Sequence, residues 1–132
     1  MVVDTSVLIA GERAGGGVAA HVPAGTPVAL SAISLMEYQR GVERTPSSQR
    51  RTRREAILRT LLRLDVLPLD AEVALTAGRV WVDLERRGTV IPVFDLLIGA
   101  TALAANRPLL TCDDRHFGLI EGLDVRILAP DA

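Results

Sequence analysis

The chain has 132 residues, 48% hydrophobic and 23% charged, which is the composition of a globular domain rather than of a disordered or fibrous protein. Its formal net charge of −1 argues against a protein that holds duplex nucleic acid mainly through phosphate contacts, because such proteins usually carry a basic excess. The 15 basic residues are all arginines. From its length, we expect one domain spanning residues 1–132.

The cysteine content and the first residues indicate the cellular compartment in which the protein is expected. Cys112 is the single cysteine, so the chain cannot form an internal disulfide, and a reducing compartment is expected. The first residues lack the positively charged and apolar regions of a signal peptide, and no run of 18 apolar residues suggests a membrane span. We therefore expect a cytoplasmic protein.

Short apolar strands alternate with helical patterns along the chain. In chain order, strands are expected at residues 2–3, 28–31, 66–69, 109–111 and 125–128. Helices are expected from Val7, from about Ser34 to Glu43, over a long amphipathic stretch after Ser48, from Asp70 to Gly88, and from Phe94 to Ala105. This alternation predicts an α/β fold, a three-layer α/β/α sandwich around a mostly parallel sheet.

Two of these helices carry clear patterns. In the helix that Asp70 is expected to cap, the apolar stripe includes Trp81, which we expect in the core or in a dimer interface rather than as a platform for bases. In the helix after Ser48, the apolar positions are Ile57, Leu58, Leu61 and Leu62. Its outer face is expected to carry Arg50, Arg51, Arg53, Arg54, Arg59 and Arg63.

Four acidic residues fall where parallel sheets bind ligands, beyond the carboxyl ends of the strands. Asp4 ends the first strand, and Asp113 follows the fourth. Glu37 is expected in the first turn of the helix after the second strand, and Asp95 opens the helix that leads to the fourth strand. Four carboxylates from distant segments can therefore converge on one rim.

Each acid also has a structural explanation. Asp4 can cap the following helix, and Ser34 with Glu37 forms a capping box, the favoured interpretation if that segment is taken alone. Asp95 can complement a helix dipole, and Asp113 with Asp114 can form a turn. Their joint placement favours a shared site, because capping does not require convergence.

Converging carboxylates would have a specific chemistry. Two of them about 4 Å apart repel by roughly 4 kcal/mol at a surface-like dielectric, so the cluster must raise its pKa values or hold a cation. Oxygen ligands without His or Cys favour Mg²⁺ or Mn²⁺ over zinc. Such ions activate water for in-line attack at a phosphodiester and stabilise the charge that develops.

The ordered motifs resemble those of PIN-domain ribonucleases, especially the VapC toxins of bacterial type II toxin–antitoxin pairs. The resemblance runs from Val2 to about Ile127. It is carried by residues 3–9 (VDTSVLI), 31–38 (SAISLMEY) with Gly41, 95–102 (DLLIGATA), and 111–113 (TCD) with His116 and Phe117.

The resemblance implies a PIN-like fold and an endoribonuclease that leaves a 5′-phosphate and a 3′-hydroxyl. It implies catalytic, metal-binding acids at Asp4, Glu37, Asp95 and Asp113, with Asp114 as the alternative to Asp113. A homodimer and a cognate VapB-like antitoxin that blocks the active site are also implied, with RNA as the substrate and no membrane as a partner.

Further residues are candidates for supporting roles. The hydroxyls of Ser6 and Thr111 can orient a carboxylate or a metal-bound water, or can be ordinary caps. Arg115 can meet an RNA phosphate or be solvated, and His116 can be a ligand, a base or a structural residue.

The arginines of residues 50–54 have two interpretations, a solvated helix face or an arm that grips RNA phosphates and offsets the low net charge. The alternative to a nuclease is a PIN-fold module that binds RNA or a protein with weak or lost cleavage. Such a module would be expected to lose one or more of the acids, and here all four are present, which favours the nuclease.

Overall fold

The computed structural model describes residues 1–113 and 115–128, which form a five-stranded sheet in the order β3-β2-β1-β4-β5. All four neighbouring pairs of strands are parallel. The strands are β1 (Val2–Val3), β2 (Ala29–Ser31), β3 (Asp65–Leu67), β4 (Leu109–Thr111) and β5 (Val125–Ile127). The predicted α/β sandwich is confirmed, with a sheet that is wholly parallel.

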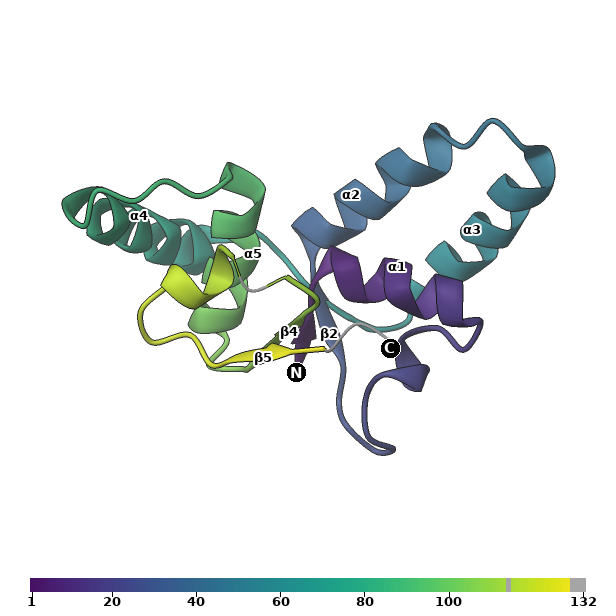
Figure 1. Cartoon of the computed structure of the whole chain (residues 1–132), viewed down its shortest axis with the longest axis horizontal. Coiled ribbons are helices and arrows are strands. Elements are labelled where there is room, and N and C mark those ends of the chain that lie inside the picture. Colours follow the sequence, from purple (N-terminus) through teal and green to yellow (C-terminus); the bar gives the residue numbers. More distant parts are fainter. Residues whose placement is uncertain (114, 129–132) are drawn as a thin grey trace.

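Helices cover both faces of this sheet (Figure 1). They are α1 (Thr5–Ala14), α2 (Ala32–Glu43), α3 (Ser48–Leu61), α4 (Ala71–Arg86) and α5 (Val93–Ala104), with 3₁₀ turns at η1 (Val18–Ala20) and η2 (Phe117–Leu119). In Figure 1, α1, α2 and α3 lie to one side of the strands, and α4 and α5 pack together on the other.

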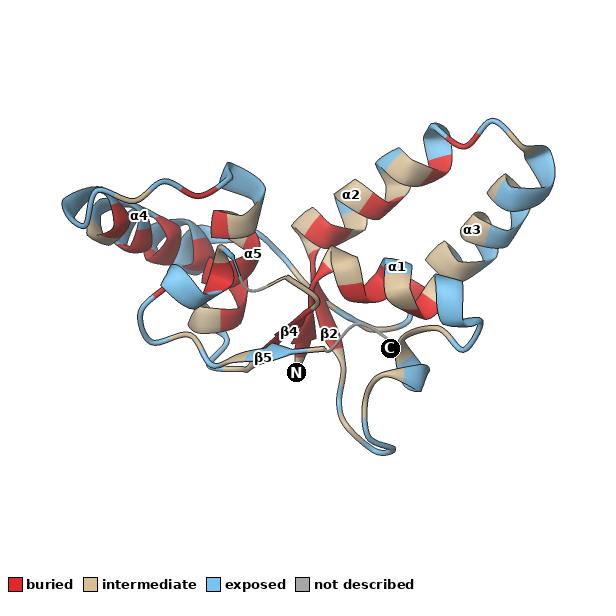
Figure 2. Cartoon of the chain, in the orientation of Figure 1, coloured by how far each residue is buried: buried red, intermediate tan, exposed pale blue. Residues whose placement is uncertain are grey.

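The central strands send alternate side chains to these two layers, as strand geometry requires. They appear as a buried band between the layers in Figure 2. The residues that pack towards α4 and α5 are Val2, Ala29 and Leu109. Those that pack towards α1, α2 and α3 are Val3, Leu30 and Leu110. Because both faces are covered, these strands are apolar throughout rather than alternating with polar residues.

Two helices begin earlier than the sequence predicts. Helix α1 begins at Thr5, separated from the two-residue strand β1 by Asp4 alone, and α2 begins at Ala32. Ser31 is extended and caps α2 by accepting a hydrogen bond from the Ile33 N–H at 3.0 Å. The predicted capping box is therefore wrong, since Ser34 is a buried residue inside the helix and Glu37 lies in its second turn.

The apolar stripes are partly confirmed. Asp70 caps α4 by accepting from the Val73 N–H, as predicted. Trp81, however, is 59% exposed, because it lies one residue beyond Val80 and points away from the buried stripe. Of its two predicted places, the core is wrong, and the dimer interface stays a prediction. Leu62 is exposed as well, at the end of α3.

The strand order fixes where a ligand can bind. From β1 the chain moves to β2 and β3 on one side, whereas β4 and β5 lie on the other side of β1. The crevice beyond the carboxyl ends of β1 and β4 is therefore the topological switch point of the sheet. Within the described residues, no helix is long and apolar enough to cross a membrane.

Candidate metal centre

Asp4 lies at the switch point, immediately after β1. Its backbone N–H donates to the Leu110 carbonyl at 2.9 Å, which ties it to the end of β4. The side chain is only 7% exposed, and although Asp4 is the N-cap residue of α1, its carboxylate makes no capping hydrogen bond. The capping interpretation of this acid is wrong, because the carboxylate is turned towards β4 instead.

Two hydroxyls hold the Asp4 carboxylate. Ser6 Oγ donates to Asp4 Oδ2 at 2.8 Å, and Thr111 Oγ1 donates to the same oxygen at 2.9 Å. Each hydroxyl also accepts from a backbone N–H, that of Cys112 for Ser6 and that of Asp113 for Thr111. The Thr111 hydroxyl also lies 3.1 Å from the Asp113 carbonyl and 3.4 Å from Ser6 Oγ, so for both hydroxyls the shortest contact to an acceptor is the one with Asp4 Oδ2.

Glu37 approaches from α2. The Thr5 hydroxyl donates to Glu37 Oε1 at 2.8 Å, so the first residue of α1 is joined to the second turn of α2. Burial raises the pKa of the Glu37 carboxyl above its ordinary value, and the charges of Asp4 and Asp95 raise it further. The Thr5 hydrogen bond and Arg40 partly offset this rise.

Asp95 lies in the first turn of α5. Its Oδ2 is 2.7 Å from His116 Nδ1, in a partly buried contact between α5 and the segment that follows β4. Burial raises the pKa of this carboxyl, with further contributions from Asp4 and Asp113, while His116 opposes the rise.

Asp113 has the opposite environment. Arg115 donates from Nε to both carboxylate oxygens at 3.0 Å and from Nη2 to Oδ2 at 2.6 Å, and its backbone N–H donates to Oδ1. These hydrogen bonds lower the pKa of Asp113 to about 2. Asp114, the alternative fourth acid, lies outside the described residues.

The four acids influence one another through their charges. Asp4 raises the pKa of both Glu37 and Asp95, Asp95 raises that of Glu37, and Asp113 raises that of Asp95. The residue after β1, the helices α2 and α5 and the segment after β4 thus carry acids whose charges act on one another. Their assignment to one metal site stays a prediction.

The side chains of these acids offer carboxylate oxygens, which are the ligand type that hard divalent cations prefer. Asp4, Glu37 and Asp95 each have one oxygen held by a hydrogen bond, and the hydrogen bonds among the described residues leave the other oxygen uncommitted. In their present rotamers, however, no three His, Cys, Asp or Glu side chains within residues 1–113 and 115–128 are grouped closely enough to hold one metal ion.

A groove of about 200 Å³ continues from the acids between α1, α2 and α3. Thr5 and Glu37 line it at one end, and Arg54 and Glu12 at the other. Arg54 Nε donates to Glu12 at 2.8 Å with both side chains mostly buried, and Arg51 pairs with Glu43 and Glu55. The predicted outer face of α3 is therefore wrong for Arg54, which joins α3 to α1.

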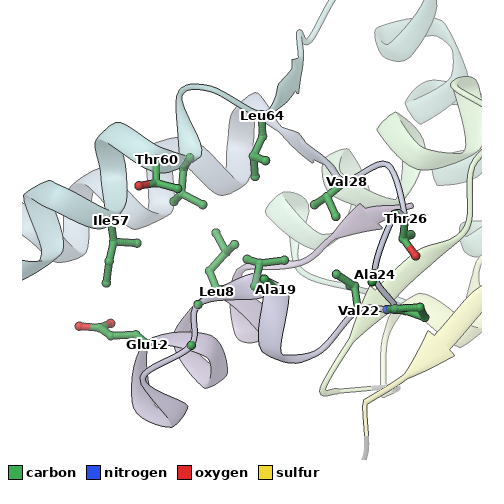
Figure 3. Close-up of a pocket in the computed structure, with 16 residues that line it drawn as sticks. Leu8, Glu12, Ala19, Val22, Ala24, Thr26, Val28, Ile57, Thr60 and Leu64 are labelled. Carbon is green, nitrogen blue, oxygen red and sulfur yellow. The ribbon is translucent and has the colours of Figure 1, made fainter.

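A larger, mainly apolar cavity of about 530 Å³ lies between α1, α3 and the segment before β2 (Figure 3). Leu8 comes from α1, Ile57 and Leu64 from α3 and the turn after it, and Val22 and Val28 from the segment before β2. Glu12 lines both this cavity and the groove beside the acids, so the two hollows meet at one residue.

Thr5 is a site residue that the sequence did not predict, and His116 is one whose place it left open. The polar run after β1 was a signal for Thr5, since any hydroxyl beside a strand-end acid is a candidate partner. His116 was ambiguous because its contact is with Asp95, 21 positions away, and no local pattern encodes that distance.

Comparison with known proteins gives one consistent result. A family model described as the PIN domain matches residues 1–122. The chain is 32% identical to ribonuclease VapC1 of Rickettsia felis, covering 95% of this chain and 93% of the relative. It is 31% identical to ribonuclease VapC5 of Mycobacterium tuberculosis, covering 96% and 93%.

A solved structure agrees with these relatives. The crystal structure of VapBC-5 from M. tuberculosis, a member of the VapBC family of toxin–antitoxin systems, is 30% identical with a TM-score of 0.76, covering 96% of this chain and 95% of that one. Fold, motif order and these likenesses agree over almost the full length. The chain therefore belongs to the PIN-domain family and, within it, to the VapC group.

Proposed function

We propose that this chain is a divalent-metal-dependent endoribonuclease and the toxin of a toxin–antitoxin pair. The observation that carries the proposal is the convergence of Asp4, Glu37 and Asp95 at the switch point of a PIN-family sheet. Carboxylates crowded in this way are stable when a cation neutralises them. The ribonuclease names of the VapC relatives support RNA as the substrate.

In this proposal Asp4, Glu37, Asp95 and Asp113 hold Mg²⁺ or Mn²⁺, and the hydroxyls of Ser6 and Thr111 keep Asp4 in place. A bound divalent ion supplies the Lewis acidity that generates a nucleophile from water and stabilises charge on the phosphodiester. Hydrolysis leaves a 5′-phosphate and a 3′-hydroxyl. Arg115 pairs with Asp113, and in this proposal it exchanges that carboxylate for an RNA phosphate.

The proposed regulator is a cognate antitoxin, as in the VapBC-5 complex. An apolar segment of the antitoxin would fill the cavity of Figure 3, and a chain that continued past Glu12 would reach Thr5 and Glu37 through the adjoining groove. The proposal includes action in the cytoplasm as one domain over residues 1–132 and a homodimer, for which the exposed Trp81 on α4 is a candidate contact.

The test uses purified protein, freed of antitoxin, incubated with total cellular RNA with and without Mg²⁺ or Mn²⁺. The matched control is Asp4→Asn, which keeps an oxygen that can accept from Ser6 and Thr111 while removing the charge. We expect discrete fragments with 5′-phosphate ends that require the metal. In the control we expect at least roughly a hundredfold less cleavage, as is typical when a group that stabilises the transition state is lost.

If the parent protein is folded and free of partner yet cleaves no RNA with either metal, the nuclease proposal is wrong, and the binding module replaces it. If Asp4→Asn cleaves as well as the parent, the assigned acids are wrong although the nuclease stands. Circular dichroism of both proteins separates these outcomes from a loss of fold.

A further inference from the structure

The three converging acids share a feature that no local motif dictates. Each has one oxygen fixed by a donor from another segment of the chain. For Asp4 the distant donor is Thr111 of β4, for Glu37 it is Thr5 of α1, and for Asp95 it is His116 after β4. A carboxylate bound at one oxygen keeps its orientation and has its second oxygen available for a ligand.

The Thr5 contact joins two separate elements. Thr5 is the first residue of α1, so its backbone position is set by the end of β1 and by Asp4 beside it. Its hydroxyl is 2.8 Å from Glu37 Oε1, although the two residues lie 32 positions apart. The strand end that carries Asp4 therefore also sets the direction of the Glu37 carboxylate.

The direction of the His116 contact follows from the charge of Asp95. When Asp95 is ionised its carboxylate can only accept, so Nδ1 of His116 then carries the hydrogen that lies between it and Asp95 Oδ2. His116 immediately precedes η2, whose Phe117 is buried in the core on the α4–α5 side. The imidazole is therefore anchored by its neighbour, and Asp95 is held from outside its own helix.

We propose that Thr5 and His116 are positioning residues, each of which holds one oxygen of an acid, Glu37 or Asp95, and leaves the other oxygen available to a divalent cation. This inference rests on the proposed function. Partners that orient metal-binding carboxylates and histidines commonly contribute roughly 10- to 100-fold to metal affinity or activity. Neither residue touches substrate or metal in this scheme, and each acts through the acid that it holds.

The test measures Mn²⁺ binding directly, by electron paramagnetic resonance and by calorimetric titration, on the full-length protein without antitoxin. Thr5→Val keeps the shape of threonine and removes the donor, whereas Thr5→Ser restores the hydroxyl. His116→Leu removes the donor, whereas His116→Asn places an amide N–H near the position of Nδ1. Thr60→Val is the matched control, because the Thr60 hydroxyl donates to a carbonyl of its own helix.

We expect Thr5→Val and His116→Leu each to weaken Mn²⁺ binding by about tenfold. Thr5→Ser and His116→Asn should stay within about threefold of the parent, and Thr60→Val should equal it. Melting temperatures measured without metal identify any variant whose fold is lost, and the Ser and Asn variants then decide the question.

The inference is overturned if the parent binds Mn²⁺ and cleaves RNA while the Val and Leu variants bind the ion equally well. It is also overturned if Ser and Asn fail to restore binding. If the parent neither binds Mn²⁺ nor cleaves RNA, the proposed function fails together with the inference, and that outcome is distinct from the first two.

Discussion

The two layers that cover the sheet are built differently. On one side, α4 packs on α5, buried residues such as Ile98 join an apolar core with the strands, and the hollow beside Leu84 is only about 150 Å³. On the other side, the cavity of about 530 Å³ separates α1 from α3, and the mostly buried Arg54–Glu12 ion pair bridges the same two helices. The first layer contributes apolar burial, and the second keeps hollows and charges close to the acids.

This contrast assigns different tasks to the two layers. A hollow in a protein costs free energy, because the side chains that line it lack packing partners on one side. Sites for ligands and partners accept that cost, and they are usually concave and lined mainly by apolar side chains. We therefore interpret the α4–α5 layer as the main source of stability and the α1–α3 layer as the main binding layer.

Truncating one buried aliphatic residue in each layer tests the contrast most strongly. Ile98→Ala should lower the free energy of unfolding by about 3 kcal/mol, as is usual for an aliphatic side chain buried in a close-packed core. Leu61→Ala should cost about half as much, although Leu61 is almost as fully buried, because it borders the cavity and is less tightly packed on that side. Urea unfolding of both variants measures the difference, and equal destabilisation would contradict the contrast.

The ion pair between α1 and α3 gives a smaller expected effect. Arg54→Gln should destabilise the protein by about 1 to 2 kcal/mol, because it leaves the mostly buried Glu12 carboxylate without its charged partner. Arg51→Gln is the matched control, since its pairs with Glu43 and Glu55 are solvated and should contribute less than about 1 kcal/mol. Similar melting temperatures for the two variants would show that Arg54 has no bridging role.

The remaining arginines of α3 test RNA binding rather than stability. Arg50 and Arg53 are exposed, and within the described residues no ion pair involves their side chains. The double variant Arg50→Gln, Arg53→Gln should keep its stability. It should also lower the slope of log affinity for single-stranded RNA against log salt by about 1.4, or roughly 0.7 for each RNA phosphate that an arginine no longer neutralises. An unchanged slope in filter-binding titrations would assign these residues to a solvated face.

Much of this molecule could be predicted from the sequence, for identifiable reasons. Strands that are buried on both faces consist of short apolar runs, so the strands at residues 2–3 and 109–111 were predicted correctly. The acids at strand ends were found because parallel strands place their carboxyl ends together. Asp70 was identified as a cap because its Val73 partner is local.

The errors share one physical cause, since each concerns a choice that tertiary contacts decide. Ser34 and Glu37 match the capping-box pattern locally, but the cap of α2 is Ser31, which is extended at the end of β2. The Glu37 carboxylate instead accepts a hydrogen bond from Thr5 of α1. Arg54 was predicted on a solvated face, but it pairs with Glu12 of α1. Trp81 was included in the apolar stripe of α4, whose buried residues stop at its neighbour Val80 and resume at Leu84. Local patterns therefore predicted the elements and the acids, whereas the partners of each side chain required the fold.

The smallest predicted effect is on stability, and it comes from the repulsion among the carboxylates at the acidic rim, which neither helical layer shares. Because the pKa of Glu37 is raised in the folded chain, the folded state binds more protons than the unfolded state just above the ordinary glutamate range. Stability should therefore fall as pH rises through that window, and Asp95 acts with the same sign. Asp113 acts in the opposite sense at lower pH, because its pKa is lowered to about 2, so its contribution is lost only as pH falls towards that value.

Glu37→Gln should remove part of the crowding while keeping an oxygen for the Thr5 hydroxyl. In buffer with chelator, we expect the variant to be more stable than the parent by less than about 1 kcal/mol at neutral pH and to lose the advantage near about pH 4. Glu85→Gln, an exposed change on α4, is the control and should show no such dependence. Because added Mn²⁺ stabilises only a protein that binds it, it should reverse the order and make the parent the more stable of the two. A variant that remains more stable at saturating Mn²⁺ would mean that Glu37 takes no part in holding the ion.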